Sequence, residues 1–135
     1  MIKYTFPSQF EYLDEIRSHV AREARAAGFS DQDIYALQLA ADEAASNIIE
    51  HAYDGRGDAS FEMDCEFQQD KLVITFRDHG KRFDVSKVSP PDVKADLSER
   101  KIGGLGIYLM RKLMDEVHYS STGAENILVL TKRKA

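Results

Sequence analysis

Several features are missing or scarce in this sequence, and each absence excludes a class of protein. The single cysteine, Cys65, excludes a disulfide bond within the chain, so an oxidising compartment is unnecessary. Cys65 falls on the apolar side of an alternating stretch, which favours a core residue over a reactive thiol. No stretch approaches the roughly 20 apolar residues of a membrane-spanning helix, and the start has no apolar signal-peptide core. We therefore expect a cytoplasmic protein that does not enter a membrane.

An excess of positive charge is also missing. The 135 residues include 18 basic and 23 acidic ones, a net charge of −5, and the basic residues are scattered apart from a short tail at 132–134. This balance argues against a surface that binds nucleic acid or an anionic membrane directly. Apolar residues, by contrast, make up 43% of the chain, which is enough for the core of one ordinary domain spanning residues 1–135.

The spacing of the apolar residues predicts helices and strands along most of the chain. A period of two predicts strands at 2–6, 61–67, 72–76 and about 127–131, the middle two joined by a tight turn near 69–70. Helical spacing predicts one helix from a capping box at Ser8 and Glu11 to Ala27, and a second from Ser30 or Asp31 to about His51. A third helix follows Gly103, with an apolar face of Leu105, Leu109, Leu113 and Val117. The order of these elements predicts an α/β two-layer sandwich, in which helices cover one face of a mixed, mostly antiparallel sheet.

The second predicted helix carries a polar stripe beside its apolar one. Glu43, Asn47 and His51 follow at four-residue steps, so their side chains share one face, about 6 Å apart along the axis. Asparagine is a poor helix former, so its place in the middle of a helix needs a reason. Taken alone, the stripe is also compatible with an ordinary solvated face, and His51 with a packed residue at the helix end.

Two glycine-bearing turns stand out farther along the chain. Asp78-His79-Gly80 ends an apolar strand, where the aspartate could simply cap a turn and Gly80 supply a positive φ. The segment 101–109, KIGGLGIYL, places three glycines at a helix start, where backbone N–H groups can hold phosphates. A tight turn into a helix would look the same. Neither the phosphate-binding P-loop spacing nor a G-x-G-x-x-G after a strand is present.

Together these three features fit one ligand, Mg-ATP. The carbonyl oxygen of Asn47 suits Mg²⁺, which takes the rest of its shell from waters and phosphates. A buried Asp78 can accept a hydrogen bond from the amino group of adenine, where guanine presents an oxygen. The glycine segment would hold the phosphates, and Glu43, one turn before Asn47, is placed to act as a base.

At these residues the sequence resembles the ATP-binding superfamily of DNA gyrase, histidine sensor kinases and a heat-shock chaperone. ADEAASNIIEHAY resembles the asparagine box of that superfamily, RDHGKRFD its first glycine box, and GGLGIYL its second. The small size and the run GLGIYLMRKLMDEV resemble the bacterial anti-sigma factor serine kinases (RsbW-like), over nearly the whole chain. This resemblance implies a Bergerat-type ATP-binding fold. One departure is that the Gly-Thr often found near the last strand is replaced here by GAEN at 123–126.

The resemblance implies a role for each motif residue. Glu43 would be the general base, Asn47 the Mg²⁺ ligand and Asp78 the residue that reads adenine. Gly80 would let the base lie close, and Gly104, Leu105 and Gly106 would contact phosphates through their backbone. A lid over ATP would span about 84–100, and the alternative phosphate partners there are Lys94, Arg100 and Lys101.

The resemblance leaves more than one function open. The first is a serine kinase that sequesters a sigma factor and phosphorylates a small antagonist protein competing for it. The second is a binding module that uses ATP only to set its affinity for a partner, which would not need Glu43. A detached catalytic domain of a histidine kinase is disfavoured, because no dimerisation helix with a phosphoacceptor histidine precedes the domain. The resemblance also implies a homodimer.

Overall fold

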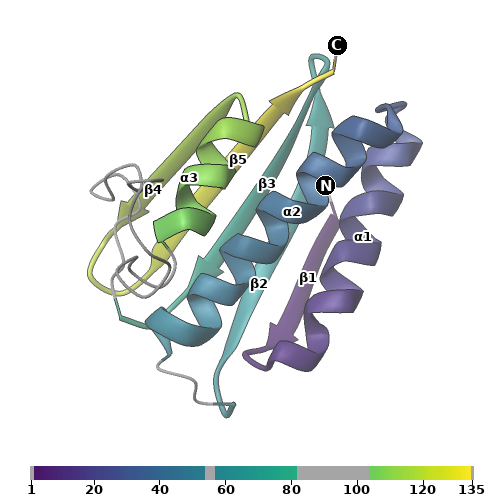
Figure 1. Ribbon diagram of the computed structural model, residues 1–135. Coiled ribbons are helices and arrows are strands. Elements are labelled where there is room, and N and C mark those ends of the chain that lie inside the picture. The colour runs from purple at the N-terminus through teal and green to yellow at the C-terminus, as the bar shows by residue number, and fades with distance from the viewer. Residues whose placement is uncertain (1, 54–56, 82–103, 135) are drawn as a thin grey trace.

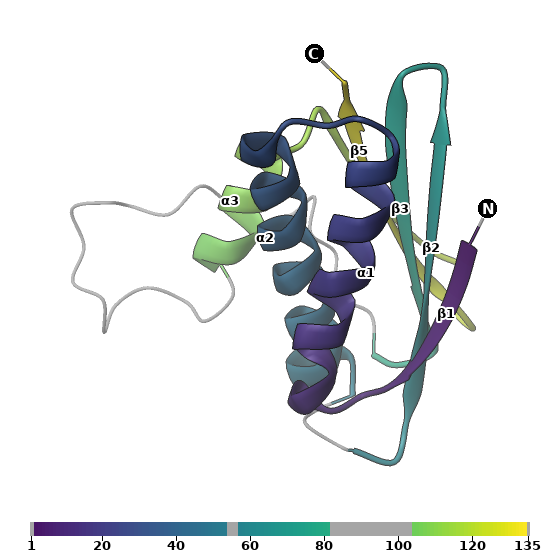
Figure 2. The ribbon, with the colours of Figure 1, turned by 90° about the vertical axis from the view of Figure 1, so that its right-hand side faces the viewer.

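The computed structural model describes residues 2–53, 57–81 and 104–134. In chain order the elements are β1 (Ile2–Pro7), a 3₁₀ turn (Phe10–Tyr12), α1 (Leu13–Ala26), α2 (Asp31–Asn47), a π-helical turn (Ile48–Ala52), β2 (Ser60–Gln68), β3 (Lys71–Asp78), α3 (Gly104–Leu113), β4 (Glu116–Ser121) and β5 (Asn126–Arg133). Figure 1 shows the three helices side by side over the sheet, and Figure 2 shows them all on the same face of it. The predicted two-layer sandwich is confirmed. None of the described helices combines the length and apolarity needed to cross a membrane.

The sheet has five strands in the order β1-β2-β3-β5-β4, and each pairing among the described strands is antiparallel. The predicted hairpin joins β2 to β3. Its turn residues Gln69 and Asp70 have φ of 52° and 62°, the left-handed conformation that a two-residue hairpin turn requires. β5 pairs with β3 although a helix and β4 intervene in the sequence, so the end of β3 lies beside the start of β5.

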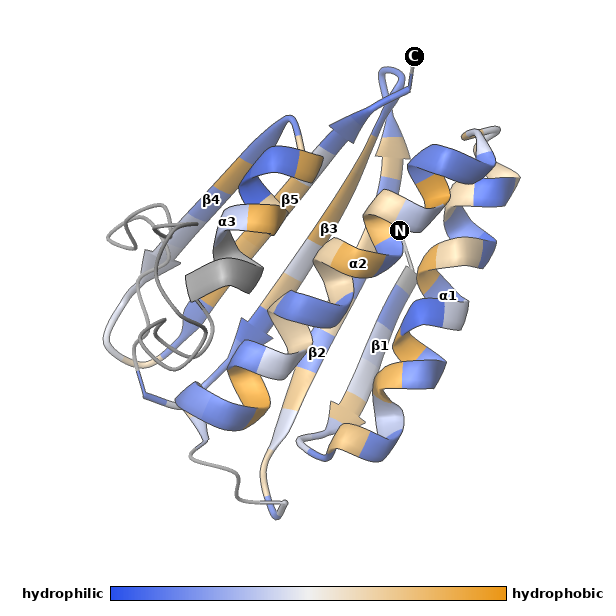
Figure 3. Ribbon diagram, in the orientation of Figure 1, coloured by the Kyte–Doolittle hydropathy of each residue, from blue (hydrophilic) through white to orange (hydrophobic). Residues whose placement is uncertain are grey.

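The core lies between the sheet and the helices. Alternate residues of the central strands are buried against α2: Phe61, Met63, Cys65, Leu72, Ile74 and Phe76. Small residues on α2 face them, which lets this helix lie close to the sheet: Ala40, Ala41, Ala44 and Ala45 are fully buried. Figure 3 shows hydrophobic residues recurring along α2 and β3 accordingly. Cys65 is 2% exposed, so its interpretation as a core residue is confirmed, and burial raises the pKa of its thiol to about 12.

The start of the first helix differs from the prediction. The helical turn begins at Phe10 with Gln9 at its N-cap position, and no side chain caps it. Ser8 is buried, and its N–H donates to the carbonyl of Ala59 at 2.9 Å. Ser8 thus closes the end of β1 rather than starting the helix, and the predicted capping box is wrong. The N-cap of α2 is as predicted, because the Ser30 hydroxyl accepts the N–H of Asp33 at 3.2 Å.

The third helix is shorter than predicted and turns a different face to the core. α3 ends at Leu113, and Val117 lies in β4, a strand that was not predicted. Leu109, which was expected on the apolar face, is 41% exposed, while Met110 is fully buried. The spacing from Leu105 to Val117 continued a helical pattern by coincidence. β4 has only two apolar residues on its partly buried face, Val117 and Tyr119, to reveal a strand.

Candidate functional site

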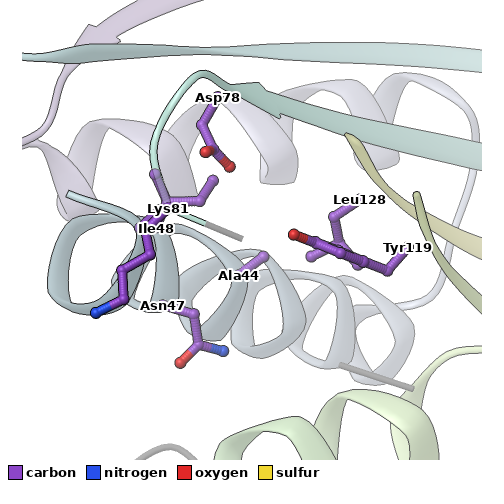
Figure 4. Close-up of a pocket in the computed structure, with 8 residues that line it drawn as sticks. Ala44, Asn47, Ile48, Asp78, Lys81, Tyr119 and Leu128 are labelled. Carbon is purple, nitrogen blue, oxygen red and sulfur yellow. The ribbon is translucent and has the colours of Figure 1, made fainter. Parts of the chain in front are cut away.

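A pocket lies where the end of α2, the end of β3 and the β4–β5 hairpin meet (Figure 4). The space among its lining residues is about 310 Å³, a volume that includes open solvent. Its lining residues are Ala44, Asn47, Ile48, Ala52, Asp78, Lys81, Tyr119 and Leu128. Asn47 and Asp78 were predicted as site residues from separate motifs, and the fold brings them to the same pocket.

Asn47 is the last residue of α2, and only 6% of it is exposed. Its side-chain Nδ2 is buried and has no hydrogen-bond partner among the described residues. A buried amide without a partner is costly and is uncommon in folded proteins. Rotation of the amide exchanges its nitrogen and its oxygen, so this position can offer a neutral oxygen to a cation. The chemistry of Asn47 therefore fits Mg²⁺, which favours oxygen ligands and retains several waters.

The helix changes its winding directly after Asn47. The predicted helical extent to about His51 is confirmed, but residues Ile48–Ala52 form a π-helical turn, closed by the N–H of Tyr53 and the carbonyl of Ile48 at 3.1 Å. Such turns are rare and frequently occur at functional sites. The carbonyl of Ala52, the last residue of this turn, accepts the N–H of Lys81 at 2.7 Å. This bond fixes the end of α2 to the chain just after β3.

Asp78 ends β3 and is 6% exposed. Its Oδ1 accepts the N–H of Gly80 at 2.9 Å and the side-chain amide of Asn126 at 2.8 Å. Burial raises the pKa of this carboxyl, and the bonds from Asn126 and Gly80 and the charge of His79 oppose that shift. Figure 4 shows the carboxylate pointing into the pocket above Ala44. Among the described residues none donates to Oδ2, which is the oxygen left for a ligand.

Gly80 makes a close backbone approach possible, though not in the way predicted. Among the described glycines, positive φ occurs at Gly28 and Gly123 and not at Gly80, so the left-handed glycine of the simple-turn alternative is absent. A Cβ on Gly80 would instead lie 2.4 Å from the carbonyl oxygen of Ala52 and 2.8 Å from the ring of Tyr53. Glycine is needed here because the end of β3 packs directly on the π-helical turn. The contact of Gly80 with a nucleotide base stays a prediction.

Glu43 lies one helical turn before Asn47 and is half-buried. Burial raises the pKa of its carboxyl, and the neighbouring carboxylates of Asp42 and Glu50 raise it further. A carboxylate with a raised pKa is a better proton acceptor for catalysis near neutral pH. Glu43 is not among the residues that line the pocket. His51, the third residue of the polar stripe, lies beside Glu50, with Nε2 and Oε2 3.8 Å apart.

The predicted glycine segment is described only from Gly104 onward. Gly104 begins α3, and Leu105 and Gly106 follow in its first turn. α3 packs beside α2, and Figure 4 shows the Asn47 amide on the side of α3 (green), away from Asp78. The expected lid at about 84–100, with Lys94 and Arg100, lies outside the described residues, as does Lys101.

Some residues of the site were missed by the sequence analysis. Tyr119 on β4 and Leu128 on β5 are partners in the register of the two strands and form one wall of the pocket. They could not be placed because β4 was not predicted. Lys81 follows Gly80 at the pocket, and although it lies in the segment that resembles the first glycine box, no role was predicted for it. Asn126 lies in the GAEN segment, whose departure from the family pattern was the one available hint.

Comparison with known proteins identifies the family. Residues 6–132 match the family model described as Histidine kinase-like ATPase domain. Serine-protein kinase RsbW of Listeria monocytogenes is 34% identical over 97% of this chain and 85% of its own length. The RsbW proteins of Halalkalibacterium halodurans and Bacillus licheniformis are 30% and 34% identical, over 97% and 87% of this chain and 82% and 76% of their own lengths.

Solved structures agree on the fold. A structure of the RsbU and RsbW domains of Rv1364c from Mycobacterium tuberculosis has a TM-score of 0.64 at 14% identity, covering 99% of this chain and 33% of that one. The Acinetobacter baumannii histidine kinase AdeS has a TM-score of 0.52 at 11% identity, covering 99% and 68%. The chain belongs to the histidine kinase-like ATPase domain family and, within it, to the RsbW-like serine-protein kinases.

Proposed function

We propose that this chain is an Mg-ATP-dependent serine kinase that phosphorylates a small antagonist protein and sequesters a sigma factor. Membership of the ATPase family implies ATP as the nucleotide, and the curated relatives are named serine-protein kinases. The observation that carries the proposal is the meeting of two predicted ligand groups at one pocket. The partnerless amide of Asn47 and the buried carboxylate of Asp78 both line it.

The positions of these groups determine the orientation that we propose for bound ATP. The adenine base lies at Asp78, whose Oδ2 accepts a hydrogen from the 6-amino group, and Tyr119 and Leu128 cover the base with apolar surface. The phosphates extend past Ala44 toward Asn47 and the start of α3. There the backbone N–H groups of Gly104, Leu105 and Gly106 and the positive end of the helix dipole stabilise negative charge.

Asn47 is the residue that would hold Mg²⁺, through its side-chain oxygen. The ion, when bound, supplies positive charge that neutralises the phosphate oxygens. One protein ligand is sufficient, because Mg²⁺ takes the remaining ligands from phosphates and water. The buried amide already lacks a protein partner, so binding an ion costs no hydrogen bond within the described part of the chain.

Glu43 is the proposed general base. Its carboxylate accepts the proton of the substrate serine hydroxyl as the serine oxygen attacks the γ-phosphorus. The bond from that phosphorus to the bridging oxygen breaks, and ADP leaves with the electron pair. Glu43 lies one turn before Asn47 on a rigid helix, so the base and the phosphates keep a fixed relation. Its half-buried position leaves it reachable from outside the pocket, where a protein substrate would approach.

The alternative is a binding module of the same fold, in which ATP only sets the affinity for a protein partner. The observation that favours it is the absence of Glu43 from the pocket lining. Partner switching, the sigma factor, the antagonist and homodimer formation all belong to the proposal, and the names of the relatives support its serine-kinase part.

The test is phosphoryl transfer. The protein is incubated with Mg-ATP and a candidate small antagonist-type protein, chosen from its neighbouring genes where they encode one, and phosphoserine is detected by mass spectrometry. Phosphate on the antagonist that is absent with Glu43→Gln establishes the kinase. An antagonist that binds with a nucleotide-dependent affinity but gains no phosphate establishes the binding module. An antagonist that does neither contradicts both functions.

A further inference from the structure

We propose that Asn126 is a positioning residue that locks the Asp78 carboxylate in one orientation and thereby confers preference for a purine with a 6-amino group. This inference rests on the proposed function, because it concerns the carboxylate assigned there to adenine. Asn126 is the first residue of β5 and is not part of any motif that pointed to the site.

The side chain of Asn126 is a buried donor surrounded by acceptors. Only 4% of the residue is exposed. Its Nδ2 lies 2.8 Å from Oδ1 of Asp78, 3.0 Å from the carbonyl oxygen of Gly80 and 3.4 Å from that of Lys81. Reversing the amide would place its oxygen against three other oxygens, so the neighbours themselves fix which end is the donor.

These bonds constrain Asp78 as well. The terminal torsion of an aspartate is soft, so a carboxylate without restraints has no single orientation. Here Oδ1 receives the N–H of Gly80 from one side and Nδ2 of Asn126 from the other. The carboxylate cannot turn without breaking both bonds, which leaves Oδ2 directed to the pocket. A carboxylate held in place before the ligand arrives loses less entropy on binding.

The strand register explains why position 126 can do this. Asp78 and Asn126 are Cα partners in the antiparallel pairing of β3 with β5, and side chains of such pairs lie in contact. The hairpin end is fixed a second time, because Nδ1 of His79 lies 3.1 Å from the carbonyl oxygen of Ala124. The backbone of Lys81 is held from both sides, by Ala52 through its N–H and by Asn126 through its carbonyl. Asn126 therefore acts on the carboxylate and on the chain that carries it.

The test compares two ligands that differ only in the 6-amino group, Mg-ATP and the Mg complex of purine riboside 5′-triphosphate. Calorimetry gives the ratio of their affinities for the full chain and for Asn126→Ala and Asn126→Leu, the second of which keeps a side chain of similar size but lacks the donor. Asn126→Ser, in which a shorter hydroxyl side chain takes the place of the amide, replaces them if neither variant folds. Thr131→Val is the matched control, since Thr131 is also a buried polar residue of β5 but lies near the other end of the strand.

The wild-type protein should prefer ATP by about tenfold or more, the value of one hydrogen bond to a charged group. Loss of the Asn126 donor should reduce this preference several-fold and change the affinity for purine riboside triphosphate by less than about twofold. Thr131→Val should keep the preference. A retained preference for ATP in the Asn126 variants overturns the proposal. An equal loss of affinity for both triphosphates also overturns it, because that result shows that Asn126 has a purely structural role.

Failure of the proposed function gives a different result. A wild-type protein that binds both triphosphates equally removes the adenine-reading role of Asp78, and the role of Asn126 with it, while leaving Mg-ATP binding intact. A wild-type protein that binds neither contradicts the nucleotide site as a whole.

Discussion

Gly80 lies directly on the carbonyl group of Ala52, so that a Cβ at position 80 would come 2.4 Å from the Ala52 oxygen. This contact joins the end of β3 to the π-helical turn that follows α2. Because Asp78 precedes the contact by two residues and Asn47 precedes the turn, the contact also sets the distance between the two ends of the pocket. The site depends on backbone packing as much as on its polar side chains.

Gly80→Ala should therefore weaken nucleotide binding through the fold. The added methyl group has to displace backbone atoms, and overpacking of this kind costs about 1–3 kcal/mol of stability. Calorimetry should show lower affinity for ATP and for purine riboside triphosphate alike, and thermal unfolding a lower Tm. Gly57→Ala is the control, because its Cβ would meet only the flexible side chain of Gln9, at 3.4 Å. Unchanged stability of Gly80→Ala would show that the contact is not tight.

The preference for ATP should depend on pH through Asp78. Burial raises the pKa of its carboxyl, so the ionised form that accepts most strongly is lost as pH falls through a value above that of an ordinary aspartate. The charged groups near it are His79 and Lys81 on the same chain segment, whereas Asn47, Tyr119 and Asn126 from the packed elements are uncharged. The ratio of the affinity for ATP to that for purine riboside triphosphate should therefore fall at acid pH. Protonation of the phosphates does not change this ratio, because both ligands carry the same triphosphate.

Two variants distinguish whether Asp78 or His79 causes that pH dependence. Asp78→Asn should give a low ratio that does not vary with pH, and His79→Gln should retain the fall. A ratio in the wild-type protein that stays constant from neutral to acid pH, over a range in which the protein is folded, would contradict titration of Asp78 at the site.

The raised pKa of Glu43 has a consequence for stability. A carboxyl whose pKa is raised on folding holds its proton more tightly in the folded state, so its contribution to stability is present at low pH and is lost as pH rises through the folded pKa. At neutral pH the ionised Glu43 should thus destabilise the protein without ligand. Glu43→Gln removes this cost, and its Tm should exceed that of the wild-type protein at pH 7 but not at acid pH. An equal or lower Tm at pH 7 would contradict the effect of burial and of the neighbouring carboxylates.

Asn47→Ala should separate metal binding from base recognition. Removing the side-chain oxygen should lower affinity for ATP in the presence of Mg²⁺ and have little effect in its absence, because the contact of adenine with Asp78 is unchanged. The measurement is calorimetry with Mg²⁺ and with a chelator. Ser46→Ala, a half-buried neighbour outside the pocket lining, is the control. An equal loss of affinity under both conditions would argue against a metal ligand at Asn47.

Local chemistry made part of this site predictable. Asn47 in the middle of a predicted helix and Asp78 at the end of an apolar strand each broke a pattern, and each lines the pocket. The roles of other residues depend on contacts across the fold. Asn126 meets Asp78 across 48 positions of the chain through strand register, and no local spacing encodes that meeting. β4 was not predicted because two inward apolar residues, Val117 and Tyr119, are too few to show a clear period of two. The wall of the pocket that β4 provides was missed with it.

The central claim is that this pocket binds Mg-ATP and reads its adenine through Asp78. The most direct test is calorimetric titration of the wild-type protein and Asp78→Asn with Mg-ATP and Mg-GTP, with circular dichroism to establish that both proteins are folded. The account predicts that the wild-type protein binds ATP much more tightly than GTP, and that Asp78→Asn, which places a donor or a neutral oxygen before the amino group, loses about 10–100-fold in ATP affinity. Equal affinity of the wild-type protein for ATP and GTP, or an ATP affinity unchanged in folded Asp78→Asn, would contradict it.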